Sequence, residues 1–234
     1  MLKSFLIIIS FSILLIASEQ IVLVVSPDMN SSTASLECIE DGKTIYKPID
    51  VNIGKNGLGW GIGFSNIIHN QLEVKKYEGD KKAPIGIFKL SSIFGYKKKS
   101  HFKMPYIYAS ENLICVDDSD SKEYNKIISL VKTKPKSFEY MRRHDSQYRV
   151  GIVVQHNTQQ RKGRGSCIFL HVEKGANKPT VGCTSMPYPD IVKIVNWLDE
   201  AKHPILIQIP KKYIKEVLKL YPQLKNAQLI QREN

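Results

Sequence analysis

The stretch Ser166-Cys167-Ile168-Phe169-Leu170-His171-Val172-Glu173 changes side-chain character from one residue to the next. Ile168, Leu170 and Val172 fall on one side of this alternation, and His171 falls on the other. A period of two residues is typical of a half-buried β-strand. The pattern therefore predicts a strand that carries the His171 ring away from the main aliphatic face.

A cysteine directly after a glycine follows this strand, at the end of Pro179-Thr180-Val181-Gly182-Cys183. The chain then reads as a helix with proline at its start and a stripe of apolar residues, namely Ile191, Val192, Ile194, Val195 and Leu198. A loop between a strand and a helix commonly displays a thiol nucleophile. Gly182 lets the backbone bend sharply and approach a bound carbonyl closely.

The thiol of Cys183 needs a partner to react at neutral pH, because a free cysteine with a pKa of about 8.5 is only a few per cent thiolate. His171 would take that proton and return it to a leaving amine. Backbone N–H groups around Gly182 and Cys183 would hold the oxyanion. The alternative interpretation is structural, since cysteines are among the most buried residues and strand histidines are often satisfied core groups.

Two motifs resemble those of the YkuD-type L,D-transpeptidase catalytic domain family, the cysteine enzymes that cross-link or trim bacterial peptidoglycan. Thr180-x-Gly182-Cys183 resembles the family's [Ser/Thr]-x-Gly-Cys signature, and residues 79–88 are similar to its Gly-Asp…Pro-x-Gly-x-Phe segment. The resemblance extends in order over about residues 20–210. Other segments that resemble one branch of the family are Gly57-Leu58-Gly59-Trp60-Gly61, Cys115-Val116-Asp117-Asp118, Tyr124-Asn125, Met141-Arg142-Arg143-His144-Asp145 and Ile168-Phe169-Leu170-His171.

Two positions depart from the family pattern. Val181 stands where many members carry a histidine, and Ser185 stands where many carry an arginine. Assignment of Cys183 as nucleophile survives both changes, but substrate binding by that arginine cannot be carried over. The resemblance implies a β-rich α+β fold, an L,D-transpeptidase-like β-sandwich with a few flanking helices, and no metal or organic cofactor.

The resemblance also implies a reaction on peptidoglycan stem peptides. Cys183 would form a thioester with the diamino acid and release D-alanine, and an amine or water would then resolve it. The sequence leaves open an L,D-transpeptidase, an L,D-carboxypeptidase that trims tetrapeptides to tripeptides, and a non-catalytic basic envelope-binding module. A general thiol protease has no motif support beyond one cysteine and one histidine.

Four further residues are candidates for substrate binding. Thr180 belongs to the signature turn, and Arg142 and Arg143 lie in a dense cationic cluster that would suit a substrate carboxylate. The same cluster would serve equally as a solvated face. His156 follows a predicted strand at 150–155 and is a second choice for the general base.

The charge of the chain favours anionic partners. Lysine and arginine number 34 against 22 acidic residues, a net charge of +12, or +11 without residues 1–18. The lysines are dispersed and accompany no nucleic-acid-binding motif, so we expect no nucleic-acid partner. Four cysteines lack metal-ligand spacing. Cys115 with Cys167 is one possible disulfide, and free buried thiols are equally compatible with the sequence. The oligomeric state is not predicted.

The N-terminus predicts export. Residues 1–18 contain Lys3 followed by an apolar run that is typical of a signal peptide and shorter than a membrane span. An uncleaved anchor stays open, and it would be the only membrane contact. We expect the periplasm or cell envelope of a bacterium, a catalytic domain over residues 19–210 and a C-terminal amphipathic helix and tail over 211–234.

Local patterns predict the other elements. Strands are expected at 20–26 and 205–209, and a hairpin at 36–46 turns at Asp41-Gly42. A helix is expected from Asp120, with Tyr124, Ile127, Ile128 and Val131 on its apolar face. Residues 91–112 read as an irregular aromatic and basic loop.

Overall fold

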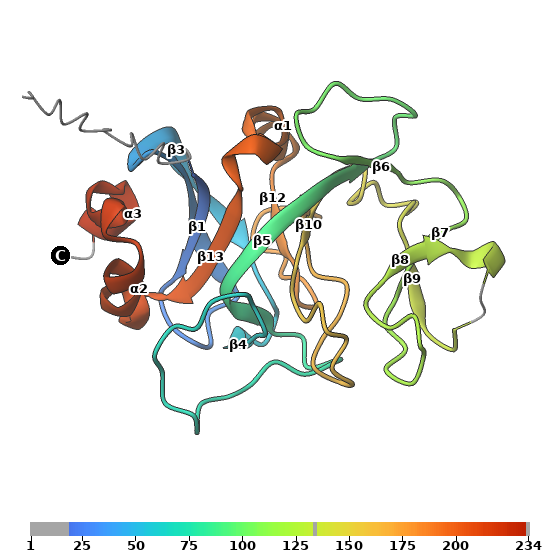
Figure 1. The fold of residues 1–234 in the computed structure, drawn as a ribbon, viewed down its shortest axis with the longest axis horizontal. Coiled ribbons are helices and arrows are strands. Elements are labelled where there is room, and N and C mark those ends of the chain that lie inside the picture. The colour runs from blue at the N-terminus through green and yellow to red at the C-terminus, as the bar shows by residue number, and fades with distance from the viewer. Residues whose placement is uncertain (1–18, 133–134, 233–234) are drawn as a thin grey trace, which may run out of the picture.

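The computed structural model describes residues 19–132 and 135–232, so the predicted signal segment lies outside the described residues. Strands dominate the fold, and the few helices lie at its periphery (Figure 1). The strands are β1 (Gln20–Ser26), β2 (Thr33–Glu40), β3 (Lys43–Asn52), β4 (Leu58–Trp60), β5 (Ala83–Gly95), β6 (Tyr106–Tyr108), β7 (Leu113–Val116), β8 (Ile127–Ser129), β9 (Phe138–Tyr140), β10 (Val150–Val154), β11 (Phe169–Val172), β12 (Thr184–Met186) and β13 (Ile205–Pro210). The helices are α1 (Tyr188–Trp197), α2 (Ile214–Leu220) and α3 (Gln228–Gln231), with 3-10 turns η1 (Leu130–Lys132), η2 (Glu200–Lys202), η3 (Lys211–Tyr213) and η4 (Pro222–Asn226).

The main sheet closes into a barrel. Its strand order is β10-β11-β12-β3-β2-β1-β13-β5-β4, and β5 also pairs with β6 and with β10. The long β5 contacts both β13 and β10, because Ile87 pairs with Ile207 of β13 while Ile93 pairs with Ile152 of β10. The β-rich fold with few helices is as expected, but the expected two-sheet sandwich gives way to a barrel closed by this one strand.

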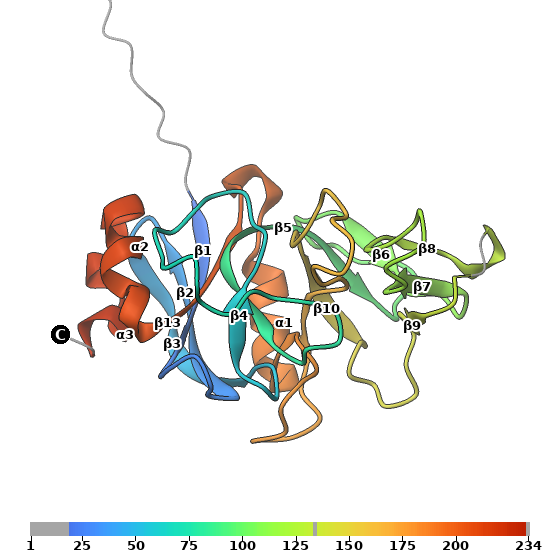
Figure 2. The same ribbon diagram turned by 90° about the horizontal axis from the view of Figure 1, so that it is seen from below.

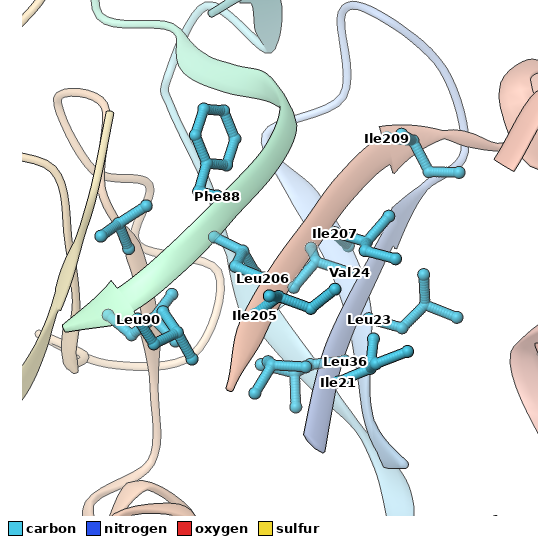
Figure 3. Close-up of a cluster of buried hydrophobic side chains, with 14 of the residues drawn as sticks. Ile21, Leu23, Val24, Leu36, Phe88, Leu90, Ile205, Leu206, Ile207 and Ile209 are labelled. Atoms are coloured by element: carbon cyan, nitrogen blue, oxygen red, sulfur yellow. The ribbon is translucent and has the colours of Figure 1, made fainter. Parts of the chain in front are cut away.

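The core forms around β1, which is buried over its whole length. β1 pairs in parallel with β13 and antiparallel with β2. Aliphatic side chains of β1, β2, β5 and β13 gather in one cluster (Figure 3). Each fully buried side chain of this kind contributes about 1.5–3 kcal/mol of transfer free energy. The described residues contain no helix long and apolar enough to cross a membrane.

A second, three-stranded sheet of order β8-β7-β9 packs against the barrel without pairing with its strands. It lies at the end of the molecule opposite α2 and α3 in both views (Figure 1 and Figure 2). A disulfide joins Cys115 of β7 to Cys167, which precedes β11. The structure thus selects the disulfide from the two alternatives, and it leaves Cys38 and Cys183 as buried free thiols.

The helix predicted from Asp120 is wrong. Turns occupy residues 120–125, and Asn125 has a positive φ of 61°, which ends any right-handed helical path. Ile127 and Ile128 then belong to β8 and pair with β7. Pairing across the small sheet therefore overrides the helical spacing of these apolar residues.

The remaining local predictions hold in most places. Strands form at 20–26 and 205–210, the hairpin turns at Asp41 and Gly42 with positive φ at both, and α1 and α2 fall where stripes were expected. Residues 91–112 are more regular than predicted, because β5 continues to Gly95 and β6 pairs alongside it in parallel.

Candidate active site

The Cys183 side chain lies at the start of the histidine-bearing strand. Its Sγ accepts a hydrogen bond from the Phe169 N–H at 3.3 Å and lies 3.4 Å from the Cys167 carbonyl, to which the thiol donates. β12 begins at the next residue and runs parallel to β11, with Leu170 opposite Thr184. This parallel pairing brings the candidate nucleophile to the strand that carries the candidate base.

His171 extends from β11 beyond the main hydrophobic cluster, as the alternation predicted. Its side chain is 4% exposed, and Nδ1 hydrogen-bonds the Val172 carbonyl at 2.8 Å. Because a carbonyl only accepts, Nδ1 carries the proton and Nε2 keeps a lone pair. Among the described residues, the thiol of Cys183 and this ring hydrogen-bond other groups and not each other.

Tyr148 contacts both the thiol and the ring. It packs edge-on against Phe169 and His171, with ring centroids 5.6 and 5.2 Å apart. Its hydroxyl donates to Glu139 at 2.8 Å and is in hydrogen-bonding contact with Cys183. Glu139 comes from β9, so the small sheet contributes a carboxyl group to this site. No sequence pattern pointed to Tyr148 or Glu139.

Burial keeps both candidate groups uncharged. It raises the pKa of the Cys183 thiol to about 12, and the Glu139 charge acts in the same direction. It lowers the pKa of His171 to about 4, with the Arg143 charge adding to the effect. At neutral pH the site therefore holds a thiol and a neutral imidazole. The imidazole can accept a proton, but no thiolate is stored before a substrate arrives.

Thr180 and Gly182 shape the turn before the thiol. The Thr180 hydroxyl donates to the Cys183 carbonyl at 2.6 Å and accepts from the Gly182 N–H at 3.1 Å. Gly182 has φ of +146°, and a Cβ there would lie 3.1 Å from the Lys82 carbonyl. Val181 is 75% exposed, so the turn reaches the surface. Thr180 is thus a structural part of the turn, and the Gly182 N–H is already used.

His156 has a different environment from His171. Its Nδ1 accepts from the Ile62 N–H at 3.2 Å, and its Nε2 donates to the Arg164 carbonyl at 2.9 Å. Burial lowers its pKa to about 4 as well. Asn125 donates to the His156 carbonyl at 2.8 Å. Because both ring nitrogens are occupied, the structure places His156 as a packing group of its loop.

The two arginines also diverge. Arg142 donates from Nε to the Ala109 carbonyl at 2.8 Å and from Nη2 to the Tyr96 carbonyl at 2.9 Å. Arg143 instead places its guanidinium 5.1 Å from the centroid of the Tyr148 ring. Arg143 therefore faces the site around the thiol, whereas Arg142 holds two neighbouring backbone segments together.

A buried lysine that sequence patterns did not single out lies behind the turn. Lys76 is 3% exposed, and its Nζ donates to the Tyr77 carbonyl at 2.6 Å and to the Asp80 carboxylate at 2.5 Å. A Cβ placed on Gly182 would lie 3.8 Å from this Nζ. The ammonium group is therefore close to the backbone that carries Cys183. In the sequence, Lys76 differs from the other lysines only in its position shortly before Gly79-Asp80.

One group of potential metal ligands occurs among the described residues. It consists of Cys115, Glu139 and Cys167. The two sulfurs are joined in the disulfide, so neither is a thiolate that could bind a metal. Of this group, only the Glu139 carboxylate could therefore act as a metal ligand.

A groove on another part of the described residues is separate from this site. It has a volume of about 740 Å³ and is lined by residues of β2 and β3 and by loop residues that include Glu173 and Asn177. Neither Cys183 nor His171 lines it. The site is therefore assigned from its chemistry and not from the size of a cavity.

Comparison with known families agrees with the motifs. Residues 21–207 match the family model of the L,D-transpeptidase catalytic domain, YkuD. The match spans most of the chain, so this protein belongs to the YkuD family of L,D-transpeptidase catalytic domains. No curated protein and no solved structure matches it.

Proposed function

We propose that this protein is an exported L,D-transpeptidase that uses Cys183 as its nucleophile on peptidoglycan stem peptides. The parallel pairing of β11 and β12 carries the proposal, because it sets the Cys183 thiol at the start of the strand that bears His171. Membership of the YkuD family supplies the class of reaction.

In the first half-reaction the Cys183 sulfur attacks the carbonyl carbon that links the stem diamino acid to terminal D-alanine. The C–S bond forms, the carbonyl electron pair moves to oxygen, and Nε2 of His171 takes the thiol proton. When the carbonyl re-forms, the C–N bond breaks. His171 returns the proton to the amine of D-alanine, and a thioester stays on Cys183.

In the second half-reaction an amine of a neighbouring stem peptide attacks the thioester. A new amide bond forms, the C–S bond breaks, and the sulfur regains its proton. Transfer to the amine gives a cross-link, whereas attack by water would give a tripeptide. No metal or organic cofactor takes part in either step.

The raised pKa of Cys183 and the lowered pKa of His171 support proton transfer that accompanies attack and does not precede it. Hydrogen bonds between catalytic groups are often long without substrate and tighten in the complex. The free Nε2 lone pair of His171 suits it to this role. His156 has no free ring nitrogen and is not proposed as the base.

Arg143 is our candidate for binding a stem-peptide carboxylate. Its Nε and Nη2 donate to the Asp145 carboxylate at 3.0 and 2.5 Å, and its side chain is 36% exposed, so a substrate carboxylate would compete with Asp145 for an accessible guanidinium. An arginine binds a carboxylate through two parallel hydrogen bonds. Arg142 does not take this role, because two backbone carbonyls already hold its guanidinium.

The envelope is the proposed location. A net charge of +11 without residues 1–18 favours an anionic cell envelope, and the apolar run of those residues supports export by a signal peptide or an anchor. Peptidoglycan is found only in that compartment.

The test is incubation of purified protein with tetrapeptide-containing muropeptides, followed by mass spectrometry. We expect cross-linked dimers together with released D-alanine. Tripeptide monomers without dimers would replace the transferase with an L,D-carboxypeptidase. Muropeptides recovered unchanged by a protein that still binds peptidoglycan would contradict both enzyme assignments and leave the binding module.

A further inference from the structure

Lys76 is unusual because its ammonium is buried. Its side chain is 3% exposed, yet it ends beside the turn that carries the candidate nucleophile. An ammonium has three N–H donors. The Tyr77 carbonyl and the Asp80 carboxylate accept two of them. Among the described residues, nothing accepts the third.

Asp80 holds this ammonium in place. Its Oδ1 accepts from Lys76 Nζ and from the Lys82 N–H at 2.9 Å, and its Oδ2 accepts from the Tyr77 N–H at 2.7 Å. The carboxylate is therefore fixed by backbone donors on both oxygens. A lysine held by such a partner loses little further freedom when it donates to a ligand. This arrangement gives the Gly79-Asp80 motif a physical role.

One backbone N–H of the turn, that of Gly182, is already engaged and does not serve as an oxyanion donor. Two preorganised donors commonly hold the oxyanion of an acyl-transfer intermediate. The Gly182 N–H, which the sequence suggested for this purpose, donates to the Thr180 hydroxyl at 3.1 Å. Lys76 Nζ lies on the side of Gly182 where a Cβ would be, 3.8 Å from that position. The buried ammonium therefore lies beside the turn whose Gly182 N–H is already engaged.

Resting on the proposed function, we propose that Lys76 is a catalytic residue whose third N–H donates to the oxyanion formed when Cys183 attacks the substrate carbonyl. The C–S bond forms as the carbonyl electron pair moves to oxygen, and the ammonium stabilises that charge without giving up its proton. The same charge lowers the pKa of Cys183 against the larger opposing effect of burial. Buried, water-excluded donors are worth more than exposed ones.

Two reactions of Cys183 distinguish stabilisation of the oxyanion from the effect of Lys76 on the pKa of the thiol. Acylation by a carbapenem passes through an oxyanion, whereas alkylation by iodoacetamide needs the thiolate but forms no oxyanion. Both rates are measured by intact-protein mass spectrometry on wild type and on Lys76→Met. The exposed neighbour Lys75→Met is the matched control, since it removes the same charge one residue away.

We expect Lys76→Met to slow acylation about 100-fold more than alkylation, the typical loss of one oxyanion donor. Lys75→Met should change neither rate more than about twofold. The double variant Lys76→Met/Asp80→Asn removes both members of the ion pair, so no uncompensated buried carboxylate can destabilise the fold. It should show the same selective loss of acylation.

Equal losses in both reactions would overturn the inference, because they would mean that Lys76 acts only on thiolate formation. Wild-type acylation rates in both Lys76 variants would overturn it as well. In either case the proposed function survives, since wild type is acylated. If wild type is not acylated at all, the proposed function and this inference fall together.

Discussion

The segments around His156 and His171 present the same side chain in two different settings. Both rings are almost fully buried, and burial lowers the pKa of each to about 4. The His156 ring accepts at Nδ1 and donates at Nε2, so its hydrogen bonding is complete. The His171 ring donates only to the Val172 carbonyl and keeps a lone pair. Burial and pKa therefore do not distinguish the two rings, whereas the unoccupied Nε2 of His171 does.

The sharpest way to break this comparison is to replace each ring with glutamine. His171→Gln should lower the rate of Cys183 acylation by about 10²- to 10⁴-fold, the usual contribution of a positioned general base. His156→Gln should change the rate less than about tenfold in protein that remains folded, because that ring does not touch the reacting atoms. Carbapenem adduct formation followed by mass spectrometry gives both rates. A larger loss in His156→Gln would reverse the two assignments.

A smaller expected effect is a pH dependence of stability that both rings share. A histidine whose folded-state pKa is lowered to about 4 binds fewer protons than the unfolded chain between pH 4 and 6.5, so its contribution to stability is lost as the pH falls through that window. The contribution of each ring to the unfolding free energy should fall by about 2 kcal/mol between pH 8 and pH 5. Glu139, whose pKa burial raises to about 7, opposes this with the other sign.

Urea denaturation of wild type and His156→Gln at pH 8 and pH 5 measures the contribution of the His156 ring to this pH dependence. Glu139 is present in both proteins, so its effect cancels in the difference. We expect His156→Gln to be less stable at pH 8 but to lose about 2 kcal/mol less than wild type on acidification. Identical pH slopes would show that the His156 ring is not held neutral in the folded protein.

The structure explains why some features were predictable from sequence. Alternation at residues 166–173 depends only on the two faces of a strand, so it predicted that the His171 ring points away from the main aliphatic cluster. The Thr180 and Gly182 pattern marked a turn whose geometry needs a glycine at positive φ. Family motifs then placed Cys183 beside that strand. Each of these signals is local to a few residues or fixed by a motif.

Other features depend on contacts that sequence spacing does not encode. Closure of the barrel requires one strand, β5, to pair on two edges. Glu139 and Tyr148 are nine residues apart but distant from Cys183 in sequence, and they come near it because the small sheet packs against the barrel. Lys76 owes its burial to Asp80 and to close packing against Gly165. The expected helix at Asp120 failed for the same reason, since pairing with β7 outweighed local spacing.

The most direct test is to map the covalent adduct after folded protein is exposed to a carbapenem. Cys38 is an internal control, because it is also a buried free thiol but belongs to the barrel core and has no role in the proposed site. The account predicts one adduct, on Cys183, that disappears in Cys183→Ala and persists in Cys38→Ala. No adduct in the folded wild-type protein, or an adduct that survives Cys183→Ala, would contradict the assignment of Cys183 as the nucleophile.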